Sequence, residues 1–198
     1  GLSITPPVIE PEDSYVYNPA FPVPTLGGNT CCNPDIIPWG AYDQSSIEAR
    51  NDVLVYTSDA LEVDIEVTGN IIVKLYASTD CLDTDFTAKL VDVSPNGSAI
   101  NLCDGIIRGR YRESTVHQKL IEPHKIYEYE INLWPTSNVF KKGHKIRVDI
   151  TSSNFPRFDR NLNTGGEFAL EHEFKLASQK IYHNKDYMSH IILPIILR

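Results

Sequence analysis

The residues best suited to chemistry gather in one loop-like stretch, from Ser152 to Asn161. Two phenylalanines, a proline, two arginines and an aspartate occur there without the spacing of a helix or a strand. The stretch follows residues 144–151, where apolar side chains at every second position predict a β-strand. Because loops are normally small and polar, an aromatic and ionic loop indicates a surface against which something packs. The residues expected in that contact are Phe155, Arg157, Phe158, Asp159 and Arg160.

A second group of chemically capable residues is acidic: Asp80, Asp83 and Asp85, with Asp92 downstream. Closely spaced aspartates can supply calcium with oxygen ligands. Their spacing lacks the Asp-x-Asp-x-Asp-Gly order and the terminal glutamate of an EF-hand loop. We therefore favour a structural interpretation, in which Asp83 and Asp85 accept hydrogen bonds from backbone amides or arginine. We expect no metal and no other cofactor.

Three arginines, Arg108, Arg110 and Arg112, alternate along the chain, so in a strand their guanidinium groups would project from one face. Three like charges in a row need acids nearby, and the aspartates of residues 80–92 are candidates on an adjacent strand. A structural ion network is the favoured interpretation. The alternative is that these arginines face a domain outside this chain.

The sequence offers no catalytic residue that a motif would identify. An α/β-type serine hydrolase needs a G-x-S-x-G elbow between a strand and a helix, and no serine here lies in one. Among the histidines, His117, His124 and His144 fall at predicted strand ends, where a solvated or capping role is expected.

The four cysteines follow no metal-binding pattern, because no C-x-x-C pair occurs. Cys31 and Cys32 are adjacent, and neighbouring cysteines rarely bond to each other because the geometry is strained. A bridge between Cys81 and Cys103 is an alternative, but we expect thiols in a reducing compartment.

Four aromatic residues, Trp39, Tyr42, Trp134 and Tyr182, could form a platform on which a sugar stacks. The simpler interpretation places each of them in the core or at an interface. Around Trp134, the order Leu-Trp-Pro-Thr predicts a strand end at which the chain turns a corner.

The elements that must position these residues are predominantly β-strands. From residue 51 onward apolar and polar residues alternate almost throughout, with turn signals such as Thr68-Gly69-Asn70 between the runs. About ten short strands and almost no helix predict a sandwich or a barrel. Residues 177–183 and 190–197 are expected to be closing strands, with Pro194 marking an edge.

The first quarter of the chain differs in composition. Residues 1–50 are rich in proline, which removes donors from a sheet, and also carry large aromatic side chains. We expect residues 1–50 to form an extended arm packed on a sandwich of residues 51–198, with a helical turn at Ser45–Arg50.

Length and charge narrow the class of protein. At 198 residues the chain is large enough for one well-buried domain, and all-β domains of this size commonly stay single. A formal charge of −8 argues against nucleic acid or an anionic membrane as a partner, because both bind basic faces. The Pro-rich start without a methionine or a secretion signal suggests a segment of a longer, cytoplasmic protein.

Several motifs together resemble the C-terminal, non-catalytic domain of X-Pro dipeptidyl-peptidases and cocaine esterase-like acyl hydrolases. The matching stretches, in order, are Phe21 to Gly28, Asp43-Gln44, Arg50 to Ser58, Asp83 to Val93, Gly105 to Arg112 and Ser152 to Asn161. The resemblance runs from about residue 15 to residue 166 and is weaker over residues 167–198.

The resemblance implies a jelly-roll β-sandwich of the galactose-binding-domain-like type, which packs on a preceding α/β-hydrolase domain. That domain would hold the nucleophile, acid and histidine, while this one shapes the substrate pocket or helps form a homo-oligomer. The resemblance also favours Phe155, Arg157, Phe158, Asp159, Arg160, Arg108, Arg110, Arg112, Asp83 and Asp85 as interface residues. The main alternative is a stand-alone carbohydrate-binding jelly-roll module, and a calcium-dependent adhesion domain is a third.

Overall fold

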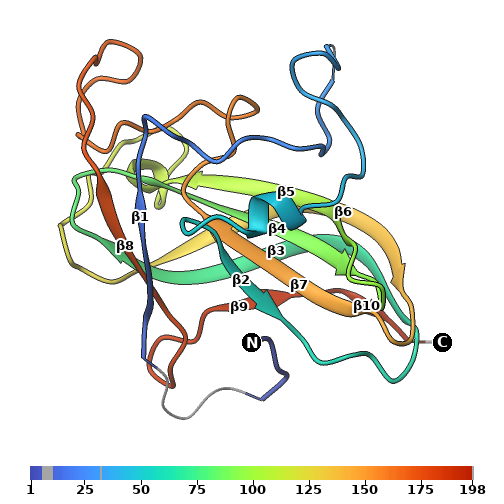
Figure 1. Cartoon of the computed structure of the whole chain (residues 1–198). Helices are drawn as coiled ribbons and strands as arrows, with labels where there is room; N and C mark the ends of the chain where they lie inside the picture. The colour runs from blue at the N-terminus through green and yellow to red at the C-terminus, as the bar shows by residue number, and fades with distance from the viewer. Residues whose placement is uncertain (6–10, 32, 198) are drawn as a thin grey trace.

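The computed structural model describes residues 1–5, 11–31 and 33–197 and consists mainly of two antiparallel β-sheets that face each other (Figure 1). The six-stranded sheet contains β1 (Asp13–Tyr17), β3 (Ile65–Thr79), β6 (Tyr127–Phe140), β8 (Ala177–Tyr182), β9 (His190–Ile192) and β10 (Ile195–Ile196). The four-stranded sheet contains β2 (Leu54–Thr57), β4 (Asp85–Val93), β5 (Ala99–Arg108) and β7 (Lys145–Thr151), in the order β2-β7-β4-β5. The all-β sandwich prediction is confirmed, whereas the galactose-binding-like type stays a prediction.

Strand β3 organises the larger sheet. It pairs with β6 along one edge, and β8, β9 and β10 pair in turn with successive parts of its other edge. β10 comes directly after Pro194 and pairs with β3 alone among the described strands, as the edge prediction requires.

The core lies between the two sheets, where alternate side chains of each strand point inward. The larger sheet contributes Val73, Leu75, Tyr129, Ile131 and Leu133, and the smaller one Phe86, Leu90, Val148 and Ile150. The rings of Phe86 and Tyr129 meet across the sandwich with centroids 4.8 Å apart. Burying one such side chain stabilises the fold by about 1.5–3 kcal/mol, so this layer is the main source of stability.

Two expected chain reversals are irregularities within long strands. Thr68-Gly69-Asn70 lies inside the 15-residue β3, where the register with β6 shifts between Asn70 and Ile72. The opposing segment of β6 carries Trp134, whose positive φ of 69° distorts the strand without ending it. The predictions of a turn at Gly69 and a corner at Trp134 were wrong because a bulge accommodates these residues while both strands continue.

The arm is partly sheet, contrary to expectation. Residues 13–17 contain no proline, so they pair with β8 as an edge strand. After β1 the chain crosses the outer face of the four-stranded sheet and includes the predicted helical turn, α1 (Ser45–Glu48). Val23 and Ile47 pack there on Val53 in a small apolar cluster. The boundary at residue 50 stays a prediction.

Candidate domain interface

The loop that follows β7 docks on the arm. The backbone N–H of Thr25 donates to the carbonyl of Phe155 at 2.7 Å, and the N–H of Phe155 donates to Val23 at 2.9 Å. Within the loop, the peptide bond between Phe155 and Pro156 is cis. Part of this aromatic and ionic loop is thus explained by contacts within the chain.

The two arginines of the loop fasten it in different ways. Arg157 donates through Nη1 to the buried carboxylate of Asp104 at 2.5 Å and lies 5.0 Å from the ring centroid of Phe158. Arg160 donates through Nη1 to the carbonyl oxygen of Pro19 at 2.7 Å. Both guanidinium groups therefore stabilise the loop, although Arg160 remains exposed.

Beneath the loop lies a buried ion network around Asp83 and Asp85. Asp83 accepts from the backbone N–H of Arg110 at 2.8 Å and from its Nε at 2.6 Å. Asp85 accepts two parallel hydrogen bonds from Arg108, both at 3.0 Å. The side-chain amide of Asn161 donates to both aspartates at 2.8 Å. The prediction that these aspartates accept from backbone and arginine groups is confirmed.

Burial dominates the electrostatics of this network. It raises the pKa of Asp85 to about 6, although the hydrogen bonds from Arg108 and Asn161 act in the opposite direction. Asp83, Asp85 and Arg110 are all buried, so they support the surface from below and are not themselves available to a partner. Arg108 extends the network outward, because its Nη2 also lies 3.3 Å from the exposed carboxylate of Asp159.

The three alternating arginines do not share one face of a strand. β5 ends at Arg108, and the chain turns into a short 3-10 helix, Gly109–Tyr111. A Cβ at Gly109 would lie 2.5 Å from Ile121, so the backbone here passes too close to Ile121 for a side chain. The regular strand ends at this point. The guanidinium of Arg112 instead lies 4.2 Å from the ring centroid of Tyr127. The sequence therefore predicted correctly that these arginines form ion pairs, but wrongly that all three project from one face of a strand.

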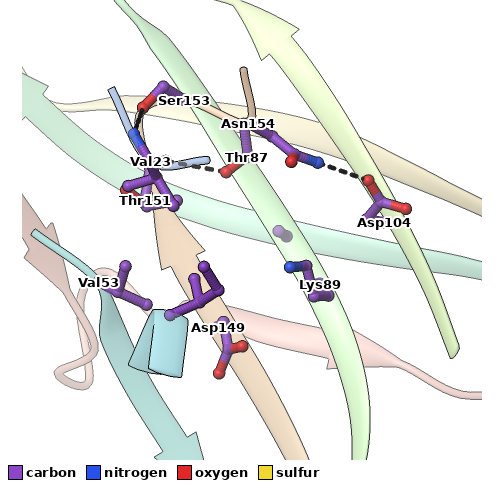
Figure 2. Close-up of a pocket in the computed structure, with 11 residues that line it drawn as sticks. Val23, Val53, Thr87, Lys89, Asp104, Asp149, Thr151, Ser153 and Asn154 are labelled. Atoms are coloured by element: carbon purple, nitrogen blue, oxygen red, sulfur yellow. Dashed lines mark hydrogen bonds between the residues drawn. The ribbon is translucent and has the colours of Figure 1, made fainter. Parts of the chain in front are cut away.

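A second charged layer, which the sequence analysis missed, lies under the arm (Figure 2). Lys89 from β4 and Asp149 from β7 are cross-strand neighbours beside a cavity of about 20 Å³. The ammonium of Lys89 donates to Gln44 on the arm at 2.5 Å, and Asn154 donates to Asp104 at 2.8 Å. The sequence does carry a pattern for this layer, namely charged residues at alternate positions of two strands. Such a pattern normally indicates a face exposed to solvent. Here the arm covers that face.

A loop of the arm projects from one end of the molecule (Figure 1). Gly28 and Gly40 close its base, each donating its backbone N–H to the other's carbonyl at 2.8 Å. Between them, Ile36 and Trp39 are 67% and 47% exposed. The loop therefore presents large apolar groups on a fixed base.

The sugar platform, which was the less favoured alternative, is not assembled. Trp39, Tyr42 and Trp134 are exposed, so the expectation of a core position is wrong for these three residues. Trp39 and Tyr42 lie on the arm, whereas Trp134 and Tyr182 belong to β6 and β8 of the larger sheet. Within the described ranges, the ring contact of Tyr182 is with Tyr187, at 5.8 Å, and none joins the four rings to one another.

The cysteines partly depart from expectation. Cys31 is disulfide-bonded, so the expectation of a thiol was wrong there, while Cys32 lies outside the described residues. Cys81 and Cys103 are free and buried, and burial raises the pKa of both thiols to about 12. They are structural residues, since a reactive cysteine needs a lowered pKa.

The described part of the chain contains no group of three or more histidine, cysteine or acidic side chains arranged to hold a metal ion. It also has no helix that is long and apolar enough to cross a membrane.

Comparison with known proteins decides the family. The model of the X-Pro dipeptidyl-peptidase C-terminal non-catalytic domain matches residues 5–192. This chain belongs to that family. Cocaine esterase of Rhodococcus sp. (strain MB1 Bresler) is 50% identical over 192 residues, which are 96% of this chain and 33% of that protein. A putative serine esterase of Mycobacterium bovis is 28% identical, over 86% of this chain and 26% of its own length.

Solved structures of the family agree. An aminopeptidase from a marine sediment archaeon, Thaumarchaeota archaeon, matches with a TM-score of 0.89 and 33% identity, over 98% of this chain and 34% of that one. An α-amino acid ester hydrolase matches with a TM-score of 0.90 and 30% identity, with the same coverage of 98% and 34%. The chain thus spans about a third of the length of its relatives.

Proposed function

We propose that this non-catalytic domain serves a serine acyl or peptidyl hydrolase, packing on an α/β-hydrolase domain of the same longer protein and shaping its substrate pocket. The observation that carries the proposal is the 50% identity to a third of cocaine esterase. The absence of a G-x-S-x-G elbow from the whole sequence supports it, because the nucleophile must then lie elsewhere. A homo-oligomer of the longer protein is compatible with this role.

The contact surface in this proposal combines exposed groups with the buried network below them. Phe155 is 40% exposed and the side chain of Asp159 is 55% exposed, and Arg160 lies beside them. Arginine suits such a surface because its planar group pairs with carboxylates and stacks on rings. Asp83 and Asp85 contribute indirectly, by fixing Arg110 and Arg108.

The projecting loop between Gly28 and Gly40 is our candidate for the part that shapes the pocket. Its fixed base and its exposed Trp39 suit a group that limits a substrate site in another domain. Substrate pockets are mostly apolar and often lie between domains.

Two tests address the proposed function. The open reading frame upstream of Gly1 should encode an α/β-hydrolase domain with G-x-S-x-G, and any other neighbour would contradict the role.

In the longer protein, Trp39→Ala should lower kcat/KM for an acyl ester at an unchanged melting temperature, with Trp39→Phe less affected. Trp134→Ala is the matched control, since Trp134 is also exposed, at 61%, but lies on the larger sheet. Equal kcat/KM in the Trp39→Ala and Trp134→Ala variants would argue against a pocket role.

The carbohydrate-binding alternative has less support, because its four aromatic residues lie on separate elements. Sugar binding by the isolated chain that is lost on Trp39→Ala or Trp134→Ala would revive it.

A further inference from the structure

A second exposed surface lies around residues 166–176, which precede β8. Its apolar members are 40% to 64% exposed: Leu82, Leu120, Phe168, Leu170, Phe174 and Leu176. We call this set the apolar end patch. It adjoins the loop after β7 that the sequence singled out, because Arg108 contacts both Asp159 of that loop, at 3.3 Å, and the ring of Phe168.

Leu82, Leu120 and Leu176 lie close together within the apolar end patch. A Cβ at Gly165 would lie 2.8 Å from Leu82 and 3.4 Å from Leu120, so these side chains surround that glycine. The carbonyl of Leu176 accepts a hydrogen bond from the thiol of Cys81, the residue before Leu82. The guanidinium of Arg108 lies over the ring of Phe168, 4.5 Å from the ring centroid.

The segment that carries the patch is anchored at both ends. Arg110 donates through Nη1 to the carbonyl of Gly166 at 2.8 Å. Asn163 donates through its amide to the carbonyl of Lys175 at 2.7 Å, and the N–H of Lys175 donates to Leu162 at 3.0 Å. The buried ion network therefore holds an apolar surface in place. A loop that is simply exposed to solvent needs neither apolar side chains nor such anchors.

We propose that the apolar end patch is the face on which the hydrolase domain of the longer protein docks; this rests on the proposed function. Soluble proteins rarely expose a contiguous apolar patch of this kind without a partner. The relatives are about three times as long as this chain, so most of such a protein lies outside the structure.

The charges around the patch define the chemistry of the docking face. Glu167, Glu173 and Lys175 are exposed among the apolar residues, and Arg108 lies on the ring of Phe168. The partner surface is accordingly apolar at its centre, with charged groups of both signs at its rim.

Hydrogen exchange provides the first test. In the longer protein, amides of residues 167–174 should exchange at least about tenfold more slowly than in the 198-residue chain, because a docked domain excludes water. Residues 184–188, in the turn after β8, are the internal control and should exchange equally in both proteins. Equal exchange of residues 167–174 in both proteins would overturn the proposal.

A matched pair of substitutions provides the second test. Leu170 and Val63 are both 64% exposed, and each is changed to glutamate in the longer protein. Leu170→Glu should lower the melting temperature by several degrees and speed proteolysis between the domains, while Val63→Glu should change neither. In the 198-residue chain both variants should melt like the wild type, which separates lost docking from misfolding.

The outcomes separate this proposal from the proposed function. If the longer protein contains a hydrolase domain but the two variants behave alike, the docking face is wrong and the function stands. If no hydrolase domain precedes the chain, the function fails as well. Self-association of the 198-residue chain that Leu170→Glu abolishes would instead assign the patch to a second copy.

Discussion

Asp149 is a buried carboxylate that receives no hydrogen bond from the described residues. Burial raises its pKa to about 7 and Glu48 adds to the rise, while Lys89 and Arg147 oppose it. The folded chain therefore binds this proton more tightly than the unfolded chain, where an aspartate titrates near a pKa of about 3.9. Protonated Asp149 therefore contributes to the free energy of unfolding. This contribution is complete below about pH 4 and is lost as pH rises through about 7.

We predict that Asp149→Asn removes this loss. At pH 8 the free energy of unfolding should rise by about 2 kcal/mol relative to wild type, and the gain should shrink by pH 5. Urea unfolding at both pH values measures it. Asp64→Asn is the control, because Asp64 is half-exposed and hydrogen bonds from Lys141 and Lys142 lower its pKa. A gain that is the same at pH 5 and pH 8 would contradict the assignment.

At this scale the sequence predicted the kinds of interaction better than their places. Asp83 and Asp85 pair with arginines as expected, because carboxylates near arginines in a buried sheet have few other partners. It did not predict the pairing of Arg157 with Asp104, which are 53 residues apart. That contact depends on how the loop meets β5, which no local pattern encodes.

At the scale of elements, β5 and β6 approach each other closely at Gly105. A Cβ there would lie 2.1 Å from the carbonyl oxygen of Asn132, so only glycine fits between the two backbones. This contact joins an edge of the smaller sheet to the larger one.

We therefore predict that Gly105→Ala destabilises the fold by about 3 kcal/mol, because the strands must move apart. Gly97→Ala is the comparison: no atom lies within 4 Å of the added methyl, and only its φ of +95° opposes alanine. That change should cost about 1 kcal/mol. Denaturant unfolding of both variants decides, and an equal loss at the two sites would disprove the close contact.

Alternating hydrophobicity predicted most strands, because one face of each must be buried. It failed where neighbours decide the outcome. Gly69 is a turn signal by composition but a bulge once β6 lies beside it, and residues 13–17 join the sheet because β8 offers an edge. The arm covers Lys89 and Asp149 through tertiary packing, so the sequence could not predict that Asp149 is buried.

At the scale of the whole molecule, a well-packed sandwich core is combined with exposed apolar side chains, among them Trp39, Phe168 and Leu170. Asp92 near the end of β4 and His144 just before β7 form an acid–histidine pair, 2.8 Å apart, with no nucleophile elbow near either residue in sequence. The molecule thus has the features of a partner domain: a rigid core, an anchored surface and no motif for a nucleophile. Family motifs predicted this role, whereas the proposed docking face rests on exposures that only the structure reveals.

The central claim, that this chain is non-catalytic, is tested most directly by labelling with a fluorophosphonate. The reagent phosphonylates an activated serine nucleophile, and mass spectrometry counts the adducts. The 198-residue chain should show no adduct and should hydrolyse an activated ester no faster than buffer, while a known serine esterase labels under the same conditions. Stoichiometric labelling of any serine in this chain would contradict the account.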